Sequence, residues 1–312
     1  MTPGVTHSET LVARRVPARR SLARSRSLKG IGYATPTAVI VGVFFLLPLA
    51  LVFWMSVNRW PLLGSPQVNF PDNYSDIPDN RLFLDSVVFT VKYTVIITVL
   101  LSAIALALAL LVQERRPGVG FLRTAYFLPG AVGFAAAALL FYGFYTGSGP
   151  LDSVLIDLGI VNEPVDWLGT PNAALFSTIA LVIWRFAGFN MLILLTGLQS
   201  IPTEVYEAAR SDGASRWQSF RYITLPLLRP TIALMLVLSI TGSLLAFDQF
   251  FILTRGGPEN STLSMVMVIY REAFTRFDLG SAAAISVVLL AVLVVLNTLQ
   301  LRVLGRRAEQ RS

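Results

Sequence analysis

The chain has 312 residues, of which 54% are hydrophobic and only 14% are charged. A soluble domain carries about 25% charged residues, so the composition excludes a soluble globular protein and places the chain in a membrane. The formal net charge of +7 at pH 7 would suit a nucleic-acid-binding protein only if the basic residues were gathered on one surface.

Long apolar stretches predict membrane-spanning helices. A helix needs roughly 20 residues to cross about 30 Å of hydrocarbon, because its backbone amides must pair within the segment. A closed β-barrel would need alternating apolar and polar residues, whereas residues 103–112 are apolar on all sides. We therefore predict an all-α polytopic membrane protein with six transmembrane helices, at residues 31–57, 84–113, 121–145, 173–198, 225–253 and 281–304.

The two ends of the chain are predicted to be cytoplasmic tails. Residues 1–29 are rich in Arg, Ser and Pro and have no apolar helical face, which predicts a basic, disordered tail that can touch anionic lipid. A cleaved signal peptide also begins with positive charge, but the apolar stretch after Lys29 is too long for one. We expect a retained first span, a six-helix domain over residues 30–305 and a short tail over 306–312.

The basic residues fall mostly on one side of the predicted membrane. Eighteen of the 25 Lys and Arg residues lie in the two tails and in the loops after the second and fourth spans, whereas five lie on the opposite side. Positively charged loops of membrane proteins stay in the cytoplasm. The asymmetry therefore predicts a multi-pass protein of the cell membrane with cytoplasmic termini and no nucleic-acid partner.

Several kinds of catalytic chemistry lack the residues they need. The chain has no Cys and one His, His7, so thiol chemistry and a multi-His metal site cannot be built from it alone. A phosphate-binding P-loop needs Gly before its Lys, but Lys29 and Lys92 follow Leu and Val. We expect no enzyme activity, cofactor or metal. The loop over residues 146–172 is interpreted as a solvated acidic loop rather than a catalytic one, with Asp152, Asp157, Glu163 and Asp166.

The loop between the fourth and fifth spans, residues 200–226, is the most informative segment. Residues 204–210 predict a short helix, which Gly213 ends because glycine readily adopts the left-handed conformation. Ser215 and Gln218 have the spacing of a capping box, so a second helix is predicted to begin at Ser215. Two short helices joined by a glycine turn would move as one rigid unit, although an ordinary amphipathic surface helix has similar apolar spacing.

The spacing within this loop resembles the EAA loop of ABC importer permeases. The matching positions, with the Asp before the glycine, are Glu207, Ala208, Ala209, Asp212, Gly213, Ile223, Leu225 and Pro226. Around it, the chain is similar to the sugar and glycerol-3-phosphate permeases of the maltose-transporter type over about residues 32–304, at Gly188-Phe189-Asn190, Phe247-Asp248, Thr254-Arg255-Gly256-Gly257-Pro258 and Thr262. Arg255 departs from the pattern, because the resemblance leads us to expect glycine or a small residue there.

The resemblance implies a type I ABC importer permease fold with a MetI-like core, in a bacterial inner membrane. It implies a heterodimer with a second homologous permease, two cytoplasmic ATPases that bind the ATP and Mg, and an extracytoplasmic, lipid-anchored binding protein that delivers a sugar or sugar-like solute. Glu207 would then sit in a groove of an ATPase and pair with an Arg there. Glycerol 3-phosphate and glycerophosphodiesters are alternative solutes.

Charged residues at membrane depth are candidates for the translocation path, because burying them there is costly. Lys92 lies about 10 Å into its predicted helix at 1.5 Å per residue, and its long stem can reach the headgroups. Arg185 lies about 18 Å in by the same rise, near the midplane. We hypothesise an ion pair between Arg185 and Asp248.

Sugars are bound by aromatic faces together with amide and carboxylate groups, and the chain supplies both kinds of group near the predicted midplane. The candidates for the path are Arg185, Asn190, Tyr142, Tyr145, Phe247, Asp248 and Gln249. Helix packing and aromatic anchoring at the membrane interface are the alternative interpretations of the aromatic residues.

Two other classes of function are weighed against the importer. An ion-coupled secondary transporter would share the hydropathy, but it would not need the EAA spacing, and the sequence shows no convincing internal repeat. A membrane-embedded enzyme would need a nucleophile or a metal site, for which the residue census leaves little material.

Overall fold

The computed structural model describes residues 33–309 apart from 62, 115 and 148, with the backbone alone for 303–309. The tail predicted over residues 1–29 lies outside the described residues. The described residues fall into two units, divided between Leu51 and Val52. Helices make up nearly all the regular structure of the described residues, and the one sheet found among them has two strands of two residues each, which confirms the all-α prediction.

Short elements precede and separate the long helices, and η1 and η2 are π-helical turns. The first elements are η1 (Gly42–Leu46), α2 (Leu47–Ser56), β1 (Asn58–Arg59), β2 (Gln67–Val68), α3 (Asp72–Ser75), α4 (Arg81–Leu111), α5 (Val119–Ala131) and α6 (Phe134–Tyr145). They are followed by α7 (Pro150–Asp157), α8 (Pro171–Gln199), α9 (Thr203–Ser211), α10 (Arg216–Ser219), η2 (Phe220–Thr224), α11 (Leu225–Leu227), α12 (Arg229–Leu244), α13 (Asp248–Leu253), α14 (Met265–Phe274) and α15 (Leu279–Glu309).

The described part of the chain contains four helices long and apolar enough to cross a bilayer. These are Tyr33–Ser56, Arg81–Leu111, Pro171–Gln199 and Leu279–Arg302. The number rises to six if each of two bent pairs is one span, namely Val119–Ala131 with Phe134–Tyr145, bent by 94°, and Arg216–Leu227 with Arg229–Leu244, bent by 64°. The third and fifth predicted spans are therefore not the continuous helices that we predicted.

The break in the third span lies at Val132 and Gly133. Pro129, in the last turn of α5, has no backbone N–H to continue the helical ladder. Val132 then adopts an extended conformation, with φ −70° and ψ 133°, and α6 begins after Gly133. Hydropathy is insensitive to these backbone angles, so the apolar stretch over residues 121–145 was wrongly predicted as one helix.

Besides the bend between Leu227 and Arg229, the predicted fifth span has a second interruption at residues 245–247. α12 ends at Leu244 and α13 begins at Asp248, so the helix predicted to continue to residue 253 is interrupted. The carbonyl oxygen of Ala246 accepts a hydrogen bond from the Ser264 hydroxyl at 2.7 Å. Such a partner is needed because non-helical backbone is tolerated at membrane depth only where its polar groups are satisfied or line a cavity.

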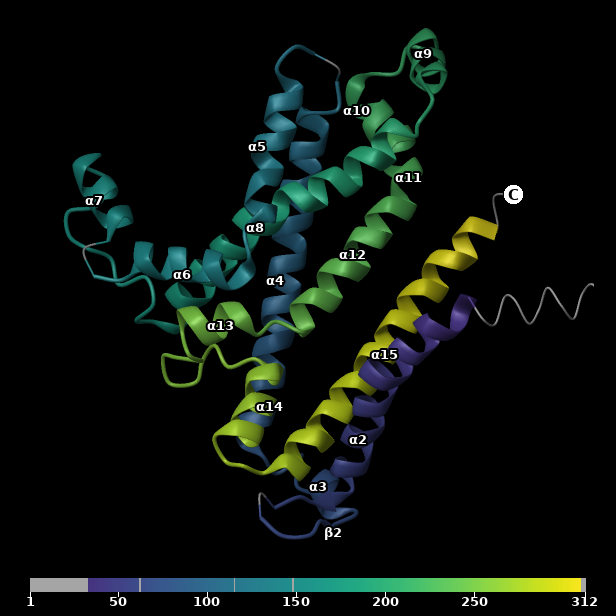
Figure 1. The fold of residues 1–312 in the computed structure, drawn as a ribbon. Coiled ribbons are helices and arrows are strands. Elements are labelled where there is room, and N and C mark those ends of the chain that lie inside the picture. Colours follow the sequence, from purple (N-terminus) through teal and green to yellow (C-terminus); the bar gives the residue numbers. More distant parts are fainter. Residues whose placement is uncertain (1–32, 62, 115, 148, 310–312) are drawn as a thin grey trace, which may run out of the picture. The chain divides into compact units, whose positions relative to one another are not determined.

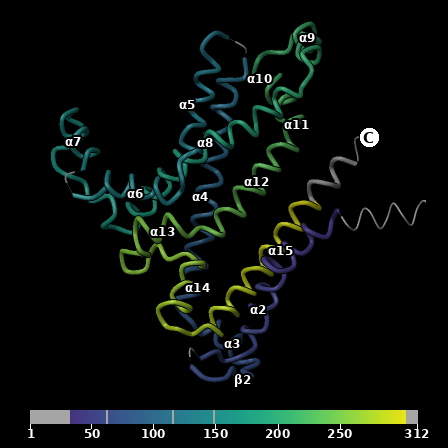
Figure 2. Tube along the Cα trace, viewed as in Figure 1, coloured from purple at the N-terminus to yellow at the C-terminus, as the bar shows by residue number. Residues whose placement is uncertain are grey.

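Within the second unit, α4 packs against α8, α12 and α14, while α5 packs against α8. Ala105 and Ala109 of α4 are fully buried, and such small side chains let helices approach closely. The hairpin formed by α9, α10 and α11 lies at the same end of α4 as the α4–α5 connection, whereas α3 and α14 lie at the other end (Figure 1, Figure 2). The 200–226 segment and the 254–264 loop are thus at opposite ends of the unit.

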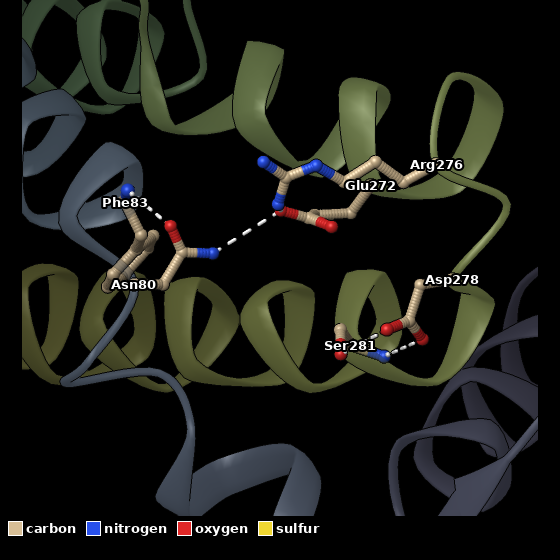
Figure 3. Close-up of polar contacts among 6 residues, drawn as sticks. All are labelled: Asn80, Phe83, Glu272, Arg276, Asp278 and Ser281. Carbon is tan, nitrogen blue, oxygen red and sulfur yellow. Dashed lines mark hydrogen bonds and ion pairs between the residues drawn. The ribbon is translucent and has the colours of Figure 1, made fainter.

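A buried carboxylate joins α4 to α14 at the α3 end. Glu272 is 3% exposed, and its side chain accepts hydrogen bonds from the side chains of Asn80 at 3.3 Å and Arg276 at 2.7 Å. Asn80 also caps α4 by accepting a hydrogen bond from the backbone N–H of Phe83 (Figure 3). The side chain that starts the second span is therefore tied to the helix that precedes the sixth.

Candidate functional site

The 200–226 segment forms a hairpin of two helical arms, as predicted. α9 is the first arm and covers Thr203–Ser211, and the second arm consists of α10, η2 and α11 up to Leu227. The second arm continues into α12 after the 64° bend at Leu228. The hairpin thus connects the fourth span to the fifth span.

The turn of the hairpin has a regular hydrogen-bonding pattern. Gly213 adopts φ 78°, which confirms the predicted left-handed position. The Gly213 N–H donates to the Arg210 carbonyl at 3.1 Å, and the Ala214 N–H donates to the Ala209 carbonyl at 2.9 Å. These two bonds are those of a Schellman motif, which satisfies carbonyls that the end of α9 would otherwise leave unpaired.

The second arm begins with the predicted capping box. The Ser215 N–H donates to the Gln218 side chain at 2.7 Å, and the Gln218 N–H donates to the Ser215 hydroxyl at 3.3 Å. A cross-arm hydrogen bond, which the sequence did not reveal, joins the hydroxyls of Tyr206 and Thr224 at 3.0 Å. Because Thr224 is buried, this bond fixes the separation of the two arms.

The hairpin exposes some of its landmark residues and buries others. Ala209 is buried, whereas the remaining first-arm and turn positions are exposed, namely Glu207, Ala208, Asp212 and Gly213. The second-arm positions are half-buried: Ile223, Leu225 and Pro226. The hairpin therefore presents a carboxylate, small residues and the glycine turn on its outer surface, which is an arrangement that a partner protein can contact.

A cavity of about 290 Å³ lies among the second to fifth spans. Its walls come from α4, α6, α8, α12, the break at residues 245–247 and the start of α13. Four of the seven residues predicted to line the path lie in its wall, namely Asn190, Phe247, Asp248 and Gln249. The break in the fifth span thus exposes a backbone turn and one carboxylate to the cavity.

Neutral polar groups dominate the polar lining of the cavity. The Gln249 amide donates to the Tyr93 hydroxyl at 3.3 Å, and the Ser239 hydroxyl donates to the Asn190 side chain at 3.4 Å. The Gln249 carbonyl oxygen and the Thr98 hydroxyl are buried without a protein partner. Unpaired buried groups of this kind are costly unless water or a ligand satisfies them, so the cavity has free hydrogen-bonding capacity.

Three of the seven predicted path residues do not line the cavity. Tyr145 is buried elsewhere, where its hydroxyl donates to the Ser177 carbonyl at 3.1 Å, and Tyr142 is exposed on α6. Arg185 donates to the carbonyls of Pro129, at 3.5 Å, and Gly130. The ion pair proposed between Arg185 and Asp248 is therefore wrong, since the ion pairs among the described residues are Glu114–Arg116 and Glu272–Arg276.

A row of hydroxyl side chains along α4 was not predicted from the sequence. Ser and Thr recur every fourth position on one face of this apolar helix, at Ser86, Thr90, Thr94, Thr98 and Ser102. Two of these hydroxyls connect distant segments, because Thr94 accepts a hydrogen bond from Ser243 and Thr90 accepts one from the Met265 N–H. The four-residue period was a signal that hydropathy averaging concealed.

The loop over residues 146–172 is only partly the solvated acidic loop that we predicted. Asp157, Glu163 and Asp166 are exposed, but Asp152 is 0% exposed and accepts hydrogen bonds from the Val165 N–H and the Trp167 indole. Asp152 fastens the loop to α7 and is not solvated. Among the described residues, no group of three or more His, Cys, Asp or Glu side chains is placed to hold a metal ion.

Comparisons with known proteins find relatives over most of the chain. The family model described as "Binding-protein-dependent transport system inner membrane component" matches residues 115–310. The trehalose/maltose transport system permease protein MalF of Thermococcus litoralis is 34% identical over 271 residues, which cover 86% of this chain and 90% of that protein. The sn-glycerol-3-phosphate transport system permease protein UgpA of Escherichia coli is 34% identical over 290 residues, which cover 91% and 96%.

A solved structure supports the fold at greater distance. The structure is the crystal structure of a bacterial ABC transporter involved in the import of the acidic polysaccharide alginate, and one of its chains matches with a TM-score of 0.80. The match covers 93% of this chain and 99% of that chain at 23% identity. At this identity the likeness shows a shared fold.

Proposed function

The chain belongs to the family of binding-protein-dependent transport system inner membrane components, and on this premise we propose that it lines, with a second homologous permease, the path of an ATP-driven importer for a neutral sugar or sugar-like solute. The observation that carries the coupling part of the proposal is the rigid hairpin that leaves Glu207 exposed. The relative named for trehalose and maltose, which matches over most of the chain, supports a sugar as the solute.

The proposed coupling works through the hairpin. A cytoplasmic ATPase binds the α9 arm and the glycine turn, and an Arg of the ATPase pairs with Glu207. Movement of the ATPase is passed to the fourth and fifth spans, to which the arms are joined. Truncating one partner of a charge pair buried at such an interface costs about 2 to 5 kcal/mol of binding free energy. ATP and Mg are bound by two copies of the ATPase, since this sequence has no P-loop.

The remaining partners follow from the family and from the charge distribution. An extracytoplasmic binding protein delivers the solute at the end of the unit that carries α3 and α14. The hairpin and both termini lie in the cytoplasm, because eighteen of the 25 basic residues fall on that side of the sequence-predicted topology. The breaks in the third and fifth spans would suit an ion-coupled carrier equally well, so they support transport without indicating the energy source.

The lining of the cavity supports a neutral solute. Among the described residues that line it, Asp248 is the charged one, and the polar remainder are hydroxyls and amides. Arg185, which could have attracted an anion, is turned toward backbone carbonyls instead. A carboxylate beside hydroxyl and amide groups binds sugar hydroxyls and repels a phosphate. Glycerol 3-phosphate is the second candidate, because the Escherichia coli relative is named for it.

Uptake into vesicles tests the coupling. The purified complex of this chain with its partner permease and ATPase is reconstituted, and binding-protein-delivered sugar uptake is measured with ATP inside. We expect uptake to require ATP and to survive collapse of the proton gradient. Glu207→Gln should abolish uptake or detach the ATPase, whereas the control Glu204→Gln, three residues earlier on α9, should retain both. Gradient-driven uptake that needs no ATP would overturn the proposal.

Uptake of different radiolabelled solutes tests the solute class. Radiolabelled maltose, trehalose and glycerol 3-phosphate are compared in the same vesicles. Neutral sugars should be taken up, and Asp248→Asn should increase the small uptake of glycerol 3-phosphate by removing the repulsion. Preferred uptake of glycerol 3-phosphate by the unmodified complex would favour the second candidate and leave the ATP-driven mechanism intact.

A further inference from the structure

Arg185 contacts the backbone at the break in the third span. Its guanidinium donates to the carbonyl oxygens of Pro129, at 3.5 Å, and Gly130. Both carbonyls belong to the last turn of α5. The Pro129 carbonyl also accepts a hydrogen bond from the Val132 N–H at 3.2 Å, whereas the helical ladder is not continued to Gly130 because α6 leaves at 94°. The side chain comes from α8, so the contact joins the fourth span to the bend of the third.

The surroundings of the Arg185 guanidinium suit a cation with a structural role. The carbonyl end of a helix carries partial negative charge and stabilises a cation placed there. The guanidinium carbon also lies 5.1 Å from the ring centroid of Phe186 and 5.9 Å from that of Phe134. Such partners compensate for the cost of a charge at membrane depth without a carboxylate. The Nε atom of Arg185 is buried without a partner, so its hydrogen-bonding capacity is not exhausted.

The contacts of Arg185 reach the cavity indirectly. Phe134, the first residue of α6, and Phe186, the neighbour of Arg185 on α8, both line the cavity, whereas Arg185 does not. The orientation of α6 therefore decides where the Phe134 ring stands in the cavity wall. A group that fixes the α5–α6 bend also fixes that wall.

We propose that Arg185 is a positioning residue for transport: by binding the carbonyl end of α5 it holds the bend between α5 and α6, and it thereby sets Phe134 in the wall of the translocation path. The effect of Arg185 on transport rests on the proposed function, whereas the bend itself can be measured without transport. Arg185 does not touch the solute and does not pair with Asp248.

A distance measurement tests the bend directly. The chain has no Cys, so spin labels can be placed at cysteines introduced at Ala125 on α5 and Leu139 on α6, both exposed positions. The complex with Arg185 intact should give one narrow distance distribution. Arg185→Gln should broaden it and move it to longer distances as the pair straightens, and Arg185→Lys, which keeps the charge, should give an intermediate distribution.

Arg123→Gln is the matched control for this measurement. Arg123 also donates to a carbonyl at a helix end, that of Val112, at 3.1 and 2.6 Å, but at the other end of α5. Its loss should leave the label-to-label distance unchanged. Identical distributions for the unmodified, Arg185→Gln and Arg185→Lys complexes would overturn the proposal, as would equal broadening by Arg123→Gln.

Uptake kinetics test the consequence. Arg185→Gln should lower the maximal uptake rate by roughly tenfold, the effect of losing a coupling element. Phe134→Ala should lower the rate similarly, and the double variant should be no worse than either single one, because both changes act on the same wall. Multiplicative losses would overturn the proposed route through Phe134. Absence of ATP-driven uptake in the unmodified complex would defeat the proposed function, while the spin-label result would still decide the role of Arg185.

Discussion

A Cβ atom at Gly188 would lie 1.9 Å from the carbonyl oxygen of Tyr126 and 2.8 Å from the backbone nitrogen of Phe127. The α5 and α8 helices therefore touch through their backbones at this point, on the cytoplasmic side of the Arg185 contact in the proposed topology. No rotamer change can relieve the clash, because the obstructing atoms belong to the main chain. The close approach depends on glycine here for steric reasons, not for backbone flexibility.

Gly188→Ala is expected to separate α5 from α8. Overpacking a tight contact costs about 1 to 3 kcal/mol, and the rigid obstacle places this site at the upper end of that range. The thermal unfolding midpoint of the purified complex should fall measurably. Gly143→Ala on α6 is the control, because nothing lies within 4 Å of a Cβ there and alanine favours a helix. An unchanged midpoint for Gly188→Ala would contradict the observed helix approach.

Local hydrogen bonds made parts of the hairpin predictable from sequence. The turn at Gly213 and the capping box of Ser215 and Gln218 are closed by bonds between residues no more than five positions apart. Such bonds depend on residue types at fixed spacings, which a sequence displays. The same positions resemble a known coupling loop. The roles of Glu207 and its neighbours in coupling come from that resemblance and stay predictions.

Distant partners made the breaks in the spans unpredictable. The Gly130 carbonyl at the α5–α6 bend is satisfied by Arg185, 55 positions away, and the Ala246 carbonyl is satisfied by Ser264, 18 positions away. The cavity is likewise assembled from separate helices, since Tyr93 and Gln249 meet across 156 positions. Hydropathy finds the apolar stretches but carries no information on which helices face each other.

Arg255 stands where we expected glycine or a small residue, and its backbone has a conformation that favours glycine. It adopts φ 51°, in the left-handed region, and Gly256 follows at φ 86°. A side chain with a Cβ costs roughly 1 to 2 kcal/mol in that conformation. Its carbonyl accepts a hydrogen bond from Arg271 at 3.2 Å, which holds the residue in place.

Arg255→Gly is therefore expected to raise the thermal unfolding midpoint relative to Arg255→Ala. Both substitutions remove the same exposed guanidinium, so their difference isolates the effect of the Cβ atom on the left-handed backbone. Glycine should be more stable by about 1 kcal/mol, after part of the gain is offset by its greater freedom in the unfolded chain. Equal midpoints for the two variants would show that the backbone at this position is not strained.

Gln249 is the cavity residue at which a single substitution best tests whether the cavity lies on the solute path. Gln249 is 3% exposed, and the carbonyl oxygen of its side chain has no protein partner. If the cavity lies on the solute path, Gln249→Leu should raise the apparent KM for sugar uptake by roughly 5- to 30-fold, the equivalent of about 1 to 2 kcal/mol for a lost hydrogen bond.

Tyr93→Phe separates solute binding from support of Gln249. It removes the hydroxyl that accepts the Gln249 amide but leaves the free carbonyl oxygen in the cavity. Its effect on KM should therefore be smaller than that of Gln249→Leu. Unchanged uptake kinetics in Gln249→Leu would show that the solute passes elsewhere, for example along surfaces contributed by the partner permease.

The hydroxyl pair of Tyr206 and Thr224 should determine how efficiently the hairpin transmits movement. Tyr206→Phe removes a bond worth about 0.5 to 1.5 kcal/mol between the two arms without changing the outer surface of α9. We expect ATP hydrolysis to continue while the number of sugar molecules transported per ATP falls, because the ATPase still binds but the arms no longer move as one body.

The control for this effect is Tyr222→Phe, since Tyr222 lies on the second arm and is 72% exposed. Loss of its hydroxyl should leave the transport ratio unchanged. Thr224→Val removes the same cross-arm bond and also the bond from its hydroxyl to the Ser219 carbonyl at 3.4 Å. Combining it with Tyr206→Phe should therefore be no worse than Thr224→Val alone. A hairpin that bends freely during the transport cycle would give a different result, with all of these variants keeping the ratio of the unmodified complex.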